Sequence, residues 1–359
     1  MDRLSLLRVA ALSGFEVATT HRLDDLPNAL FPSPEKAFFS SRVWYETVIA
    51  HALPDGIAPH FVGVSENNAM MGVFPLRLDP AGPASLTTPY TCLHAPLFAA
   101  DASDGGLLAA AFGRFCRRYP LVRIDALDEA GPETAALIAG ANAAGLAVRR
   151  FRHFGNWHEA LAGRDWGAYL AARPGSLRET IRRKLRRSKA QTTLGVFRGI
   201  EGLEAGIAAF EHVYARSWKE AEPFPRFNPA LMRAIAPLGI LRLFVLSAPS
   251  GPVAVQFWVV TGGIATVLKL AHDEDARALS PGTVLTAEAI RHLIDEDHII
   301  GLDFGRGDDP YKAQWVGSRR QRIGLLLVNP RRPAGLFALA RHGIGALTRG
   351  LRARRPPPP

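Results

Sequence analysis

The chain contains very few cysteines. Cys92 and Cys116 are the two among its 359 residues, and their separation does not form a CxxC pair. A disulfide framework is therefore excluded. Because free cysteine behaves as a small hydrophobic residue, both side chains are predicted to be buried, reduced thiols in a cytoplasmic protein.

Several catalytic signatures are missing as well. The sequence has no HExxH pair, no Cys/His ligand set, no GxSxG segment and no Walker loop. These patterns mark zinc hydrolases, α/β-hydrolases and P-loop nucleotidases. We therefore predict no metal site and none of these reaction types.

Long apolar runs are also absent. No stretch reaches the roughly 20 apolar residues that cross a membrane. The first residues are interrupted by Arg8 and no small-residue cleavage pattern follows, so no signal peptide is expected. The hydrophobic content of 48% still provides substantial cores. These features favour a cytoplasmic globular protein.

The positive charge is concentrated in two segments. The formal net charge is +10, and residues 177–189 carry seven cationic side chains and a single acid. Residues 331–355 carry seven arginines and no acid. The remainder of the chain is slightly negative, whereas nucleic-acid-binding proteins usually carry their charge on the folded face. The pattern argues against nucleic acid as a general partner.

Hydrophobic patterning predicts two α+β halves. The first half, 36–160, begins with a capped helix and a hairpin, and continues with alternating helices and strands. The second half, 161–330, begins with helices and then has three successive strands, predicted at 240–248, 252–262 and 263–273. Residues 1–35 are poorly patterned and are predicted to be a lead-in, and 331–359 a basic tail.

The segment 272–292, HDEDARALSPGTVLTAEAIRH, is the most informative. Its Pro281-Gly282 loop follows a predicted strand and opens directly into a helix. Helix N-termini expose unpaired N–H groups and the positive end of the dipole, and glycine lets a phosphate approach closely. With Arg277, Ser280 and Thr283 beside it, this loop suits an anion. An ordinary capped helix has the same pattern.

The order of elements in this half resembles the core of the GNAT acyltransferases. In that family, a loop of the pattern Q/R-x-x-G-x-G/A holds the pyrophosphate of acyl-CoA. The chain has RALSPG at 277–282, which matches at Arg277 and Gly282 and has serine at the first glycine position. The resemblance implies acyl-CoA as co-substrate, bound by Arg277, Ser280, Pro281, Gly282 and Thr283.

A more specific resemblance covers about 165–328. The segments LRETIRRKLRR, SPGTVL and DFGRGDDPYKAQW follow one another in this order, as in the CelD-like branch of GNAT proteins, which is related to the FemABX ligases. FemABX-like proteins often carry two GNAT-like halves. The resemblance implies an α/β (α+β) fold of tandem GNAT-like domains, each a mixed, largely antiparallel sheet flanked by helices.

The resemblance also implies catalytic positions. In GNAT enzymes a tyrosine on the helix of the DFGRGDDPYKAQW block often protonates the departing CoA thiolate, and Tyr311 is the positional candidate. A core tyrosine is the alternative. Acyl transfer also needs a base to take the acceptor's proton, and the candidates are Asp303, His272 and Asp273.

Further polar residues are candidates for binding the substrate. Lys269 lies near the end of a predicted central strand, and Gln256 is a lone polar residue in AVQFWVV. The resemblance adds the motif positions Arg306, Lys312 and Trp315. For Lys269 and Gln256, a structural or solvent-facing role is the alternative.

The two basic segments allow more than one reading. Residues 177–189 are predicted to form a helix whose cations face solvent, attract an anionic substrate or CoA, or contact nucleic acid or membrane. In 331–355, apolar residues recur at helical spacing among arginines, a pattern that is compatible with peripheral membrane contact. Because three glycines weaken the helix, packing on the domain or partial disorder is favoured over it.

Three functional hypotheses follow. The first is a cytoplasmic, membrane-associated or soluble acyltransferase that moves an acyl group from acyl-CoA to an amine or hydroxyl, on a small molecule or a glycan precursor of the envelope. The second is a FemABX-like transferase that uses aminoacyl-tRNA. The third is a GNAT-like scaffold without activity that binds membrane or nucleic acid through its basic segments.

Overall fold

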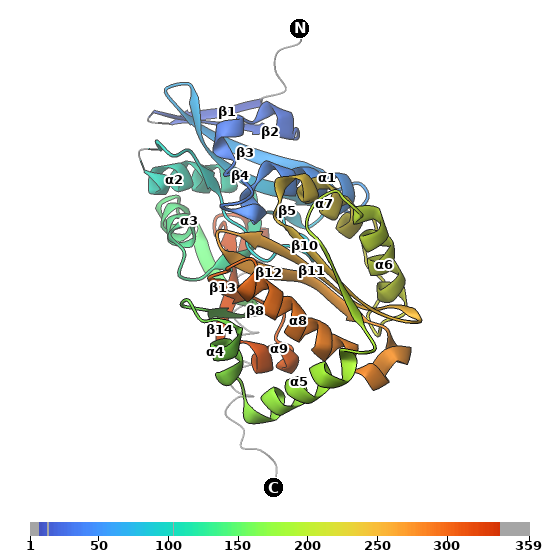
Figure 1. Ribbon diagram of the computed structural model, residues 1–359. Coiled ribbons are helices and arrows are strands. Elements are labelled where there is room, and N and C mark those ends of the chain that lie inside the picture. Colours follow the sequence, from blue (N-terminus) through green and yellow to red (C-terminus); the bar gives the residue numbers. More distant parts are fainter. Residues whose placement is uncertain (1–6, 13, 103, 338–359) are drawn as a thin grey trace. The chain divides into compact units, whose positions relative to one another are not determined.

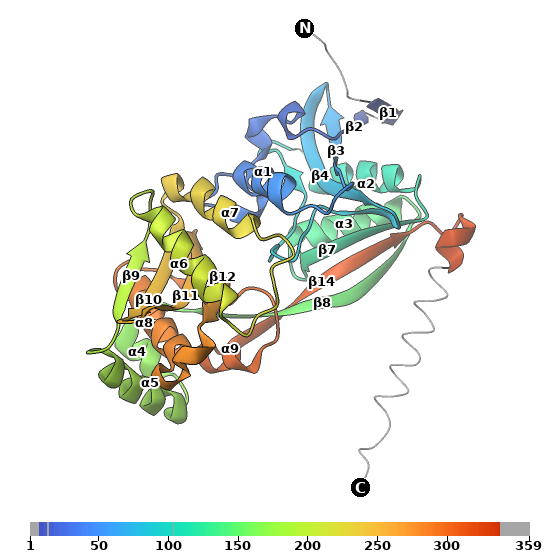
Figure 2. The same ribbon diagram turned by 90° about the vertical axis from the view of Figure 1, so that its right-hand side faces the viewer.

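The computed structural model describes residues 7–12, 14–102 and 104–337. The chain forms two compact units whose course is not linear (Figures 1 and 2). The second unit takes residues 32–53 and 154–321, and the first takes the rest. Residues 32–53 thus belong with the second unit and 322–337 with the first, which differs from the linear ranges predicted from the sequence.

The first unit is a mixed sheet covered by two helices. Its strands run in the order β1-β2-β3-β4-β5-β7-β14, with β6 beside β4, and the pairing is antiparallel except between β5 and β7. The strands are β1 (Leu7–Leu12), β2 (Phe15–Thr20), β3 (Pro59–Glu66), β4 (Ala69–Asp79), β5 (Gly82–Ser85), β6 (Leu97–Phe98), β7 (Leu121–Asp128), the start of β8 (Ala147–Ala160) and most of β14 (Ser318–Val328). The helices are α2 (Gly105–Cys116) and α3 (Pro132–Ala143).

The two helices of the first unit pack closely. A Cβ on Gly140 would lie 2.3 Å from the backbone carbon of Ala109, so glycine is required where α3 crosses α2. Phe74 of β4 stacks on Phe112 of α2 with ring centroids 4.0 Å apart. Cys116 is also in this core, and burial raises the pKa of its thiol. Both cysteines are buried and free, as predicted.

The described part of the predicted lead-in contains two strands. β1 and β2 form an antiparallel hairpin, and β2 continues the sheet by pairing with β3. Phe15 and Val17 alternate inward from β2 and are buried. The strand is short and ends in two buried threonines, which weakens its apolar alternation. The pairing with β3 stabilises it instead.

The second unit is a mixed sheet with helices on both faces. Its strands run in the order β8-β13-β12-β11-β10-β9, antiparallel except between β12 and β13. The strands are the end of β8, β9 (Thr193–Phe197), β10 (Leu241–Ala248), β11 (Gly251–Thr261), β12 (Ile264–His272) and β13 (Gly301–Asp303). The helices are α1 (Arg42–His51), α4 (Trp166–Ala171), α5 (Gly175–Ser188), α6 (Leu203–Ala215), α7 (Phe227–Ile235), α8 (Pro281–Asp295) and α9 (Pro310–Trp315).

Helix α8 is the centre of the second unit's core. It packs on β10, β11 and β12 and has α5 beside it, while α6 covers the opposite face of the strands (Figures 1 and 2). Trp258, Trp315 and Phe304 are fully buried in this core. From α5, Leu177 and Ile181 reach it, which leaves most of the helix's cations on the outer side. Burial of two apolar residues fixes this orientation.

No helix in the described part of the chain is long and apolar enough to cross a membrane. The predicted membrane-contacting tail at 331–355 lies mostly outside the described residues, which end at Phe337.

Candidate active site

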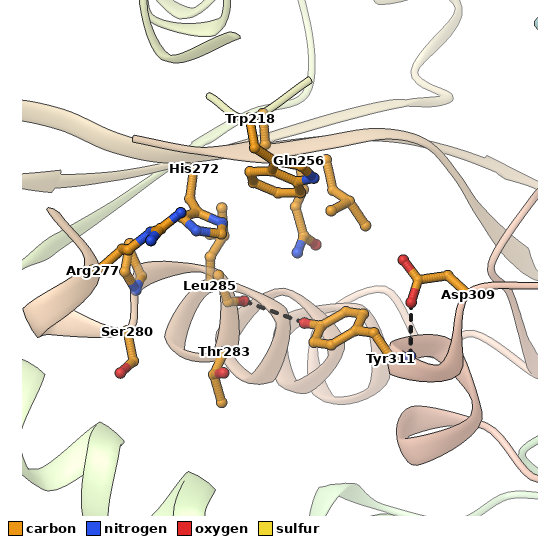
Figure 3. Close-up of a pocket in the computed structure, with 13 residues that line it drawn as sticks. Trp218, Gln256, His272, Arg277, Ser280, Thr283, Leu285, Asp309 and Tyr311 are labelled. Carbon is orange, nitrogen blue, oxygen red and sulfur yellow. Dashed lines mark hydrogen bonds between the residues drawn. The ribbon is translucent and has the colours of Figure 1, made fainter. Parts of the chain in front are cut away.

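The candidate site is a pocket of about 340 Å³ in the second unit. It lies between the carboxyl end of β12 and the first turns of α8, and α9 and the loop after α6 complete it (Figure 3). The lining residues are Trp218, Gln256, Leu270, Ala271, His272, Arg277, Ser280, Pro281, Gly282, Thr283, Leu285, Asp309 and Tyr311. Ligands of α/β sheets commonly bind at the carboxyl ends of strands.

The strands separate at this pocket. β12 and β13 pair in parallel only as far as Thr266 and Asp303, whereas β12 continues to His272. Along 267–272, the pairing among the described strands is with β11 alone. A bulge at Leu268, where Phe257 faces Lys269 and Trp258 faces Val267, adds to the local twist. Leu270, Ala271 and His272, which lie in this part of β12, line the pocket.

The first turn of α8 forms one end of the pocket. Ser280 adopts φ +52° before Pro281, and its carbonyl accepts from the amides of Thr283 and Val284 at 3.1 Å. The amide of Gly282 lies in the first turn, where a helix offers no acceptor of its own. A Cβ on Gly282 would lie 3.1 Å from His272 Nδ1. The missing side chain therefore keeps this end of the pocket open.

Tyr311 lines the pocket, and a chain of hydrogen bonds holds its hydroxyl in place. Its hydroxyl lies 2.7 Å from Thr286 Oγ1, which donates to the Gly282 carbonyl at 2.8 Å. Gln256 Nε2 donates to Thr286 Oγ1 at 2.6 Å, and Trp258 Nε1 donates to Gln256 Oε1 at 2.9 Å. Because Trp258 donates to the oxygen of the Gln256 amide, the nitrogen of that amide is the atom that faces Thr286. Burial raises the pKa of Tyr311, so its hydroxyl keeps its proton at neutral pH.

His272 is held against an aromatic wall. Its ring lies 4.4 Å from the Trp218 ring, centroid to centroid, and both line the pocket (Figure 3). Burial, and then the nearby Arg277, lower the pKa of His272 below its usual 6.5. The imidazole is therefore neutral at pH 7 and has a nitrogen that accepts a proton.

Arg277 and Asp273 flank the pocket and have partners. The Arg277 side chain is 70% exposed and pairs with Glu274, so it is placed to meet a charged group entering from solvent. Asp273 accepts from Arg216 at 2.6 Å. Although burial acts in the opposite direction, Arg216 lowers the pKa of Asp273. This bond makes Asp273 a weaker candidate for the base than His272.

Lys269 does not line the pocket. It pairs with Glu222, and its ammonium lies 5.8 Å from the centre of the Tyr214 ring. Lys219 sits nearby, and burial followed by repulsion from Lys269 lowers the pKa of Lys219. Lys269, Glu222 and Lys219 therefore form a cluster of interacting charges.

Asp303 belongs to a buried network outside the pocket. Its Oδ1 accepts from Asn156 Nδ2 at 2.6 Å and from the Gly305 amide at 2.7 Å. Its Oδ2 accepts from Arg320 at 2.6 Å. Both oxygens thus hold the turn after β13 in place. This geometry favours a structural role over the predicted role as a base.

The other motif positions are also used internally. Lys312 is buried and donates to the Arg306 carbonyl. The Arg306 guanidinium lies 4.2 Å from the centre of the Phe154 ring. Trp315 is buried, and its carbonyl accepts from Tyr169 at 2.5 Å. Of the block DFGRGDDPYKAQW, Asp309 and Tyr311 are the residues that line the pocket.

Sequence reasoning missed several residues here. Helix α6 ends at Ala215, and the loop that follows it carries Trp218 to the pocket. Thr286 was overlooked although it follows Gly282 by one helical turn and therefore shares its face. That spacing is the signal that identifies it.

Residues 175–313 match the model of the acetyltransferase (GNAT) domain family. The match contains every residue that lines the pocket. It covers less than half of the chain. No curated protein has a significant sequence match to the chain.

Solved structures resemble the chain at low identity. FemX has a TM-score of 0.56 and 12% identity, over 87% of this chain and 97% of that one. The C-terminal domain of a putative lysylphosphatidylglycerol synthetase from Agrobacterium fabrum has 0.50 and 14%, over 75% and 84%. A tandem GNAT protein from the clavulanic acid biosynthesis pathway has 0.49 and 13%, over 87% and 98%. The structure confirms the predicted mixed, largely antiparallel sheets flanked by helices, and the GNAT domain match lies within the second unit.

Proposed function

We propose that this chain is an acyltransferase that moves an acyl group from acyl-CoA to an amine or hydroxyl acceptor. The observation that carries the proposal is the pocket at the separated end of β12, closed at one side by the amides of α8. An extended amide chain fits the open edge of a strand, and a pyrophosphate fits a helix N-terminus. The match of 175–313 to the GNAT domain supports this assignment.

Each end of the pocket has a part in binding the donor. Acyl-CoA supplies the reactive carbonyl and a thiolate leaving group. The Gly282 amide and the N-terminal end of α8, with Arg277 at the opening, would hold its pyrophosphate. Main-chain N–H groups of β12 beside Leu270 and Ala271 would hydrogen-bond the pantetheine amides and the acyl oxygen, where negative charge develops.

Two side chains would carry out the proton transfers. His272 is neutral and accepts the proton that the acceptor loses, directly or through one water. The new bond joins the acceptor atom to the acyl carbon, and the bond from that carbon to sulfur breaks. Tyr311 then gives its proton to the thiolate. The proton count balances when solvent returns the proton from His272 to Tyr311.

The acceptor proposed is a small molecule or a glycan precursor of the cell envelope, in line with the CelD-like resemblance. The second candidate is a FemABX-like transferase whose donor is aminoacyl-tRNA. The fold likeness to FemX and the seven cations of residues 177–189, six of them in α5, favour it. Its binding to RNA would fall steeply with salt, because released counterions drive such binding. Membrane contact through 331–355 would show as loss of liposome binding when the tail is deleted.

Calorimetric titration with acetyl-CoA and longer acyl-CoAs tests the first function. We expect saturable binding by the wild type and loss of binding in Gly282→Trp, because the indole fills the helix N-terminus and displaces His272. Gly199→Trp is the matched control, since a Cβ at Gly199 meets nothing within 4 Å. A folded wild type that binds no acyl-CoA would refute the proposal and direct the search to charged tRNA.

A further inference from the structure

A second cavity of about 350 Å³ lies beside α8, along the face that carries Val284, Glu288 and Arg291. It is formed where the end of α5 meets α8, and these helices run beside each other (Figure 1). The strands β9 and β10 close it. The lining residues are Leu185, Arg186, Ser188, Lys189, Thr192, Leu194, Leu246, Val284, Glu288 and Arg291. None of them lines the candidate active site.

The cavity carries uncompensated positive charge. Its one acid, Glu288, is paired with Arg291. Arg186 and Lys189 make no ion pair with any residue in the described ranges of the chain. They also neighbour further cations along α5, and like charges one turn apart destabilise a helix. A bound anion would relieve this repulsion.

The floor of the cavity is apolar. Leu246 and Val284 are buried, and Leu185 and Leu194 are half-buried. The hydroxyls of Ser188 and Thr192 are not available to bind an anion, because each already donates a hydrogen bond. Ser188 donates to the Leu185 carbonyl, and Thr192 donates to the Ser188 carbonyl. An occupant therefore meets cations at the rim and hydrocarbon beneath.

We propose that this cavity binds an organic phosphate, with the phosphate at Arg186 and Lys189 and the attached apolar or aromatic body on the leucine floor. A guanidinium binds phosphate oxygens in pairs, and a lysine adds a point charge. Two sources share this chemistry. One is the adenosine phosphate end of a nucleotide such as CoA, and the other is a phosphate carried by a lipid.

A purely structural account of these cations exists and has its own prediction. Positive side chains in the last turn of a helix interact favourably with its dipole, and Arg186 and Arg187 both occupy the last turn of α5. Arg187 does not line the cavity. Arg187→Gln therefore removes the same charge from the same turn and is the matched control for Arg186→Gln.

The test is calorimetric titration of the full chain with two probes, adenosine 3′,5′-bisphosphate and a monomeric short-chain phosphatidate. We expect saturable binding of at least one probe, weakened about tenfold or more in Arg186→Gln and in Lys189→Gln. We expect less than about twofold weakening in Arg187→Gln. No binding of either probe to the folded wild type would overturn the proposal. Equal weakening in Arg187→Gln would also overturn it, because diffuse surface charge would then explain the binding.

Repeating the titration with saturating acetyl-CoA identifies the source. Competition between acetyl-CoA and the bisphosphate means that the cavity holds the nucleotide end of CoA. Independent binding of either probe means that it holds a separate phosphate ligand. The cavity is tested by direct binding, so its result stands whether or not the chain transfers acyl groups.

Discussion

Replacing Thr286 by valine tests whether the hydrogen-bond chain behind Tyr311 serves the reaction. Valine has nearly the shape of threonine but lacks its hydroxyl, so the packing of α8 is kept. Gln256 Nε2 and the Tyr311 hydroxyl lose a partner at 2.6 Å and 2.7 Å, respectively. Gln256 is 2% exposed, and water does not replace the lost bond.

The magnitude follows from these contacts. Leaving a buried polar group without a partner costs about 1–3 kcal/mol, so Thr286→Val, which affects two such groups, should lower the free energy of unfolding by about 2–6 kcal/mol. For catalysis, the loss of one bond that orients the proton donor should lower kcat about tenfold, which corresponds to about 1.4 kcal/mol. KM for acyl-CoA should change little, because the amides of α8 are untouched.

Steady-state acyl transfer and urea unfolding are the two assays. Thr286→Ser is the control, since it keeps an oxygen at the same position and should recover most of both losses. A Thr286→Val enzyme with unchanged kcat would refute the role in catalysis, even if its stability falls. Equal losses of kcat in the valine and serine variants would also refute it, because altered packing and not the hydroxyl would then be responsible.

Three further outcomes are expected. Tyr311→Phe should lower kcat about 100-fold with little change in KM, measured by thiol release. Asp303→Asn should cost about 2–3 kcal/mol in urea unfolding, because Arg320 loses its charged partner, while activity per folded molecule stays near that of the wild type; a selective loss of kcat would instead make Asp303 a catalytic group. His272 has a folded pKa below 6.5, so the unfolded chain binds the proton more readily. Its contribution to stability is therefore present above pH 6.5 and is lost as pH falls through the folded value. His272→Gln should flatten that part of the pH–stability curve.

Local patterns explain how much of the fold could be predicted from the sequence. The Asn67-Asn68 and Gly262-Gly263 turns adopt the positive φ angles that their residues favour, and they separate strands close to the predicted bounds. Alternation and helical spacing are properties of neighbouring residues. β1 and β2 were not predicted because β2 is held by its pairing with β3, tens of residues away, and β1 by its pairing with β2.

In the candidate site, too, local features could be predicted from the sequence and long-range contacts could not. Residues 280–283 were found because a loop that opens a helix is a local feature, and all four line the pocket. Asp303 was assigned to catalysis because its partners are remote in sequence. Asn156 and Arg320 lie 147 and 17 residues from it. A carboxylate at a strand end does not reveal from sequence whether such partners reach it.

The order of the two units along the chain affects when each unit can fold during synthesis. Strand β14 pairs with β7, from Arg322 opposite Asp128 to Val328 opposite Leu121. Nearly all of the second unit is synthesised between these two strands. During translation, the first unit therefore lacks its last strand until the second unit has been synthesised. A gene fragment cut at residue 321 would leave β7 with an unpaired edge, which favours aggregation. To express the two units separately, β14 would have to be added to the first unit so that it can pair with β7, because a single cut in the chain removes it.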